Sequence, residues 1–139
     1  MRRAGALAAV LPLLVGLEAV GFLIAAIIHL GVPLPVGFTE PVILPAAIAE
    51  ALIGLFLAIA GLALVAGGRR AWALAIAAHL FGVAGVLVGM FALVVGAGPS
   101  TEANEIYHRV ALIVLVAVLA LLWTERGRRA AGREPPAPR

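Results

Sequence analysis

Ionisable side chains interrupt four otherwise apolar stretches of the sequence. They are two glutamates and three histidines, namely Glu18, His29, Glu50, His79 and His108. Imidazole and carboxylate groups bind Zn, Fe and Cu, and imidazole also ligates the iron of haem. The same groups hold and release protons, so they serve as proton relays within membranes. These residue types favour metal or haem binding and proton transfer, and both depend on how the surrounding segments place the side chains.

The composition indicates a membrane protein. Of the 139 residues, 64% are hydrophobic and 12% are charged, and the mean hydropathy is +1.17. A soluble domain has about 45–50% apolar and about 25% charged residues. The difference excludes an ordinary soluble globule, and it excludes a nucleic-acid-binding chain in spite of a pI near 11.1. Because the chain has no cysteine, it forms neither a disulfide nor a thiolate metal site.

Four stretches are long enough to cross a membrane, because about 20 apolar residues in a helix span the hydrocarbon core. They cover residues 4–30, 42–66, 71–95 and 106–123. We expect an all-α polytopic membrane protein, an antiparallel four-helix transmembrane bundle over residues 1–125. The Arg- and Pro-rich residues 126–139 have no apolar period, and we expect them to be a disordered tail.

Breakers and capping residues predict where three of these helix ends lie. Pro41 suits the start of the second helix, and Gly67 suits its end. Ser100 or Thr101 is a suitable N-cap for the fourth helix, with Glu102 in its first turn.

The arginines indicate which side of the membrane each loop occupies. In a four-span arrangement, nine of the ten arginines fall on one side, and the opposite loops, residues 31–41 and 96–105, contain no basic residue. Basic residues stay cytoplasmic. We therefore expect a plasma- or inner-membrane protein with both termini in the cytoplasm. The nine are Arg2, Arg3, Arg69, Arg70, Arg126, Arg128, Arg129, Arg133 and Arg139.

The polar residues within the spans share helix faces with small residues. Glu18 and His29 are eleven residues apart, about three turns, so they lie on one face. Small residues mark helix contacts in membranes, so these polar groups should point into the bundle. The small residues beside His79 are Gly82, Gly85 and Gly89, and those beside Glu50 are Ala47, Gly54, Ala58 and Gly61.

At about 1.5 Å per residue, the polar groups fall into two sets by depth. His29, Glu50 and His108 lie in the outer half, and they predict a site for a transition metal (Zn, Fe or Cu) or haem, used in redox chemistry or metal handling. Side chains at the same end that would support this site are Glu40, Asn104 and Glu105. A local ion pair between Glu105 and Arg109, four residues apart, is the alternative role of Glu105.

The deeper set contains Glu18 and His79, which suit a proton relay. The gross plan resembles the small multidrug transporters, with four spans in a short chain and a glutamate in the first, here within residues 16–21 (GLEAVG). The resemblance implies a proton-coupled small-solute carrier in which solute and proton compete for Glu18. The chain departs from that family in having few aromatic residues in the second and third spans and a strong arginine bias.

A third interpretation is a non-catalytic membrane subunit, whose polar groups only set the helix register. Its partners would be the lipid bilayer and either a second copy or another membrane subunit. Trp72, Tyr107 and Trp123 lie at the ends of spans, so they are interpreted as anchors at the membrane interface. The sequence leaves the three functions open, and does not decide whether the protein is an enzyme.

Overall fold

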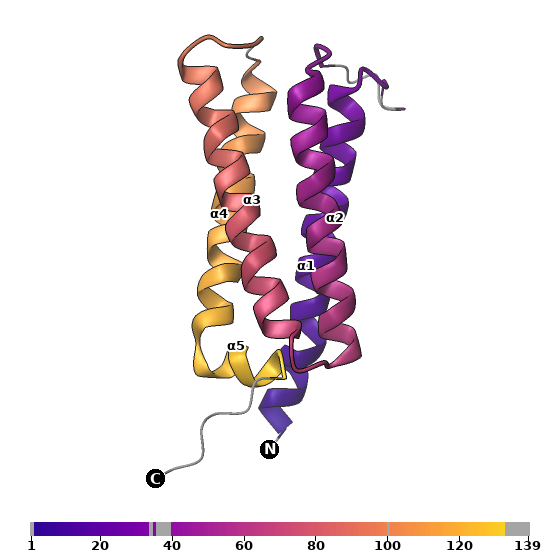
Figure 1. Cartoon of the computed structure of the whole chain (residues 1–139), viewed down its shortest axis with the longest axis vertical. Helices are drawn as coiled ribbons and strands as arrows, with labels where there is room; N and C mark the ends of the chain where they lie inside the picture. Colours follow the sequence, from indigo (N-terminus) through magenta and orange to yellow (C-terminus); the bar gives the residue numbers. More distant parts are fainter. Residues whose placement is uncertain (1, 34, 36–39, 100, 133–139) are drawn as a thin grey trace.

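The computed structural model of the chain is a bundle of antiparallel helices (Figure 1). It describes residues 2–33, 35, 40–99 and 101–132. Within these residues there is no strand, which confirms the all-α class. The helices are α1 (Arg2–His29), α2 (Leu44–Ala66), α3 (Ala71–Val94), α4 (Glu102–Trp123) and the short α5 (Glu125–Ala130).

The first four helices are long and apolar enough to cross a membrane. Their outward faces carry large apolar side chains. Leu62, Val65 and Val94 are 70%, 73% and 85% exposed, respectively. Such faces are unfavourable in water and suit contact with lipid tails. The fold is therefore that of a multi-pass membrane protein, and the predicted spans agree with the helices to within about four residues.

The bundle consists of two hairpins, α1 with α2 and α3 with α4, that pack through contacts between α2 and α3 and between α1 and α4. The start of α1 and the end of α5 lie at the same end of the bundle (Figure 1). We call this the terminal end, and the opposite end, where α1 ends and α4 begins, the distal end.

Two of the predicted helix ends are confirmed and one is wrong. Gly67 ends α2 in the left-handed region at φ 68°, and Thr101 caps α4 by accepting the N–H of Asn104 at 3.1 Å. By contrast, α2 begins at Leu44, not at Pro41. The segment before it is held as a loop, because the N–H of Ile43 donates to the carbonyl of His29 at 2.9 Å.

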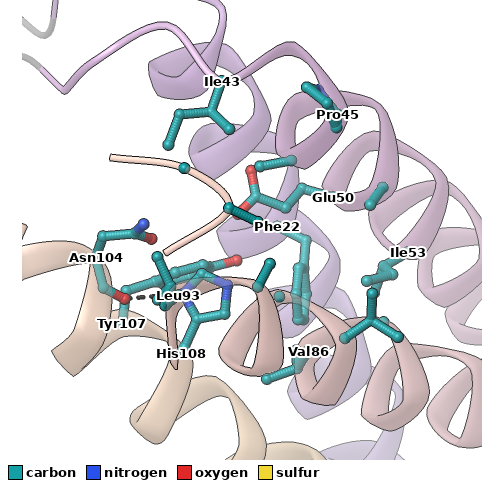
Figure 2. Close-up of a pocket in the computed structure, with 18 of the residues that line it drawn as sticks. Phe22, Ile43, Pro45, Glu50, Ile53, Val86, Leu93, Asn104, Tyr107 and His108 are labelled. Carbon is teal, nitrogen blue, oxygen red and sulfur yellow. Dashed lines mark hydrogen bonds between the residues drawn. The ribbon is translucent and has the colours of Figure 1, made fainter. Parts of the chain in front are cut away.

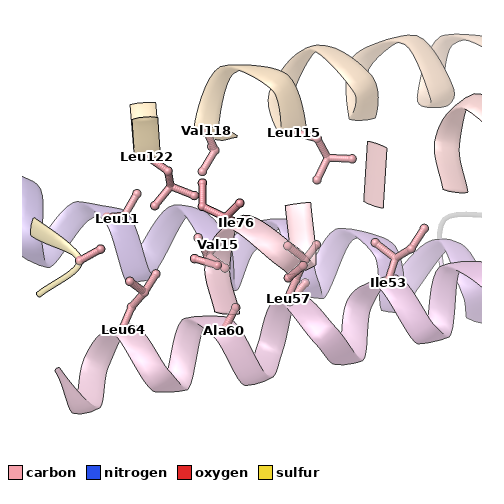
Figure 3. Packing of buried hydrophobic residues seen from close by; sticks show 14 of the residues in the cluster. Leu11, Val15, Ile53, Leu57, Ala60, Leu64, Ile76, Leu115, Val118 and Leu122 are labelled. Carbon is pink, nitrogen blue, oxygen red and sulfur yellow. The ribbon is translucent and has the colours of Figure 1, made fainter. Parts of the chain in front are cut away.

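Apolar side chains fill the terminal half of the bundle (Figure 3). Glycines on α3 allow the close approach of its neighbours. A Cβ added at Gly85 would lie 2.7 Å from Ile53 Cδ1, and one at Gly82 would lie 3.2 Å from Leu115. The small-residue face of α3 is thus a helix contact, as predicted. The central buried residues are Leu11, Val15, Leu57, Ala60, Leu64, Ile76, Val118 and Leu122.

The segment after Trp123 forms α5, so the prediction of disorder is wrong for residues 126–132. Thr124 caps this helix by accepting the N–H of Gly127 at 2.9 Å. The turn between α4 and α5 is tight. It brings Gly127 against the carbonyl of Leu121, where a side chain would not fit. Ala131 is 2% exposed within the core. Residues 133–139 of the predicted tail lie outside the described residues.

Candidate functional site

Glu18 of α1 and His79 of α3 meet in the middle of the bundle, as the sequence predicts. His79 Nε2 lies 2.9 Å from Glu18 Oε2, and His79 is 0% exposed. The other ring nitrogen, Nδ1, lies 2.7 Å from the carbonyl of Ala75. A carbonyl only accepts hydrogen bonds, so Nδ1 carries a proton. The bond to Glu18 therefore holds one further proton, either on the carboxyl group or on Nε2.

His29 of α1 and Glu50 of α2 form a second pair, closer to the distal end. His29 Nδ1 lies 2.7 Å from Glu50 Oε2, and the two residues are 3% and 5% exposed. Unlike His79, this histidine has no partner for its second nitrogen among the described residues. His29 Nε2 and Glu50 Oε1 are both buried without a hydrogen-bond partner. The pair consequently retains a nitrogen and an oxygen that a further group can bind.

His108 does not join this pair. Its Nδ1 donates to the carbonyl of Asn104 in its own helix at 2.8 Å, and its ring lies against Gly89 of α3. Across the described part of the chain, no three His, Asp or Glu side chains are placed to hold a metal ion together. The structure thus brings together His29 and Glu50 from the predicted metal set, but not His108.

The three predicted supporting residues have different surroundings. Glu40 accepts a hydrogen bond from Thr101 Oγ1 at 2.7 Å, which connects the loop before α2 to the start of α4. Glu105 forms an ion pair with Arg109 at 3.2 Å on the exposed surface, the local alternative for this residue. Asn104 is buried, and its Oδ1 has no hydrogen-bond partner.

Two cavities flank the His29–Glu50 pair. The distal cavity, of about 190 Å³, opens between α2, α3 and α4 and is bounded by Phe22 of α1 (Figure 2). Its polar lining comes from Glu50, Asn104, Tyr107 and His108, and the rest is mainly apolar. A side cavity of about 150 Å³ lies between α1 and α4. It is lined by His29, Glu40, Asn104 and Tyr107, with apolar residues of α1.

Tyr107 is a site residue that the sequence interpretation missed. Its hydroxyl is buried near Glu50 rather than at the membrane interface, meets no described residue in good hydrogen-bonding geometry, and the residue lines both cavities. Its ring packs edge-on against Phe22 at 6.1 Å and against His108 at 5.3 Å. The signal was its spacing, because Asn104, Tyr107 and His108 share one helix face.

Comparison with known proteins adds no relative. No family model, no curated protein and no solved structure matches the chain. The functional argument therefore rests on the geometry of the two pairs and the cavities beside them.

Proposed function

We propose that the protein is a proton-coupled carrier of a small solute, with the distal end facing outward and both termini in the cytoplasm. The observation that carries this proposal is the Glu18–His79 pair, which is buried in the middle of a bundle of membrane-spanning length. Ionisable groups at that depth are costly, and they commonly mark ion and substrate pathways.

The hydrogen bonds of His79 explain why loss of the proton that it shares with Glu18 would be coupled to the arrival of a solute. With one proton in the bond, the pair is neutral whether that proton is on Glu18 or on Nε2. Without it, the lone pair of Nε2 would face a carboxylate, and a net negative charge would be buried in an apolar environment. Loss of the proton is thus favourable only when a compensating group or water reaches Glu18. This linkage is what proton-coupled transport needs.

The position of the distal cavity supports the same proposal. On α1 and α3, the lining residues nearest in sequence to the pair are Phe22 and Gly85, which follow Glu18 and His79 by four and six residues. Those intervals correspond to about 6 Å and 9 Å along a helix. On the other side of the pair, apolar side chains fill the terminal half (Figure 3). The arrangement is suited to a state that is open toward the distal end and closed toward the terminal end.

A transport assay with the reconstituted full-length chain tests the proposal. Proteoliposomes containing a pH-sensitive dye would be given a panel of small neutral, anionic and cationic solutes. We expect at least one solute to drive proton movement through the wild type, and none to do so through Glu18→Gln. Glu102→Gln, on the exposed face of α4, is the matched control and should behave as the wild type. Proton movement that survives in Glu18→Gln, or no solute-driven movement in any sample, would refute the carrier.

Metal or haem binding is the second candidate, and we propose it because of His29. Its Nε2 is buried without a hydrogen-bond partner among the described residues, and His29 lines the side cavity. This nitrogen could therefore serve as a metal ligand next to Glu50. His108 would have to give up its bond to Asn104 to join them. A visible spectrum and elemental analysis of the purified protein test this proposal. Near-stoichiometric metal or haem that is lost in His29→Ala supports it, and a colourless, metal-free sample after supplementation removes it.

A further inference from the structure

The distal cavity contains several buried polar atoms without partners. Glu50, Asn104 and Tyr107 line it, and within the described residues Glu50 Oε1, Asn104 Oδ1 and the Tyr107 hydroxyl meet no partner in good hydrogen-bonding geometry, although Tyr107 and Glu50 are close enough to interact. Glu50 and Asn104 are each 5% exposed. Figure 2 shows these side chains reaching the same space from two helices. Buried polar groups are nearly always paired, so such a cluster calls for a ligand that pairs with it.

Most of these atoms accept hydrogen bonds. Glu50 Oε1 and Asn104 Oδ1 are acceptors by their chemistry. His108 supplies a third acceptor when its ring is neutral, because its Nδ1–H donates to the carbonyl of Asn104 and Nε2 is then the nitrogen without a proton. A complementary ligand must therefore supply several donors from one head group.

The charges around the cavity favour a cation. Neither arginine nor lysine lines it, and Glu50 contributes a carboxyl group to its wall. The rings of Phe22 and Tyr107 add faces that attract a positive charge. An anion would be placed next to this carboxyl group, and His108 is the one basic side chain in the described part of the lining that could offset the repulsion.

The size and walls of the cavity limit the rest of the ligand. An engineered cavity of about 150 Å³ holds benzene, so the 190 Å³ here suits a molecule slightly larger than benzene. Ile53, Val86 and Leu93 supply apolar walls for a ring or short chain.

We infer that the distal cavity binds a small primary organic ammonium ion, whose three N–H groups meet Glu50, Asn104 and His108 while its apolar body lies against Phe22 and Val86. This inference deepens the proposed function by naming the class of solute. It rests on that function only for the statement that the ion is transported.

Three ligands of similar shape separate charge from shape in the test. Benzylammonium, benzyl alcohol and benzoate would be titrated into the purified full-length chain in detergent, with binding measured by ligand-observed NMR. We expect saturable binding of benzylammonium, binding of benzyl alcohol about tenfold weaker or less, and no binding of benzoate. If benzylammonium binds no better than benzyl alcohol, the inference is wrong.

Two variants place the ion in the cavity. Glu50→Gln removes the charge and should weaken benzylammonium binding by about tenfold or more, whereas Glu102→Gln should leave it unchanged. Because Glu50→Gln also alters the bond to His29, Tyr107→Phe provides a second test. It keeps the ring and should weaken binding a fewfold through loss of the hydroxyl. Wild-type affinity in both folded variants would overturn the inference.

The outcomes for this site and for the carrier are distinguishable. If the wild type moves protons with benzylammonium, and Glu18→Gln binds it normally but moves none, both stand. If benzylammonium binds through Glu50 and the wild type moves no protons with any solute, the site stands and the carrier fails. If another class of solute drives protons while benzylammonium does not bind, the carrier stands and the ammonium site fails.

Discussion

Replacing Glu18 by glutamine and by alanine tests the hydrogen-bond argument at the centre of the bundle. Because His79 Nδ1–H is donated to Ala75, Nε2 can accept from an amide as it would from Glu18 if the shared proton lies on the carboxyl group. Glu18→Gln should therefore change the free energy of unfolding by less than about 1 kcal/mol. Glu18→Ala leaves His79 Nε2 without a hydrogen-bond partner, and because the ring is fully buried this should destabilise the protein by about 1–3 kcal/mol. The substitution also opens a cavity, which adds to the loss.

Thermal unfolding of both variants in one detergent measures this difference, since about 1 kcal/mol shifts Tm by a few degrees. Glu102→Gln and Glu102→Ala, on an exposed position, are the matched controls. The double variant Glu18→Leu/His79→Leu should recover much of the loss, because apolar residues can replace a buried polar pair with little net change. If glutamine destabilises as strongly as alanine, the shared proton lies on His79 Nε2 and the two residues form an ion pair, which refutes its placement on Glu18.

Two further predictions concern packing and orientation. A Cβ at position 89 would lie 2.6 Å from His108 Nε2, so Gly89→Ala should displace the ring by about 0.8 Å to reach ordinary contact, weaken its bond to Asn104 and lower Tm. Gly21→Ala is the control and should not lower Tm, because a Cβ at position 21 meets nothing within 4 Å. Equal changes in Tm for the two variants would contradict this packing. Since the chain has no cysteine, single cysteines introduced at Arg70 and Pro99 can report its orientation through labelling with a membrane-impermeant maleimide. In intact cells we expect labelling at position 99 alone, whereas labelling at position 70 alone would reverse the proposed topology.

The helices were predictable because the bilayer sets their length and glycine or a capping residue sets their ends. Gly67 ends α2 and Thr101 caps the start of α4, as the sequence indicates. The contact between Glu18 and His79 was also predictable, because both lie at similar depth on faces that must avoid lipid. Depth and face together determine which polar groups can meet.

Depth alone could not place His108. Its direction is set by a hydrogen bond to a carbonyl of its own helix, and a spacing pattern does not reveal that choice. The short α5 was missed for a related reason. Its formation depends on the Thr124 cap and on the close approach of Gly127 to Leu121, while the surrounding composition is typical of a disordered tail.

The two Glu–His pairs differ in a way that orders their proposed roles. Both ring nitrogens of His79 are engaged, so its pair can exchange a proton only by rearranging. His29 Nε2 and Glu50 Oε1 are unengaged beside the two cavities, so the distal pair can take up a proton or a cation with its mutual bond intact. A solute arriving from the distal end would therefore meet a group ready to bind it before reaching Phe22. Only its further movement past that ring would bring it to Glu18, where displacement of the proton shared with His79 would be coupled to transport in the proposed carrier.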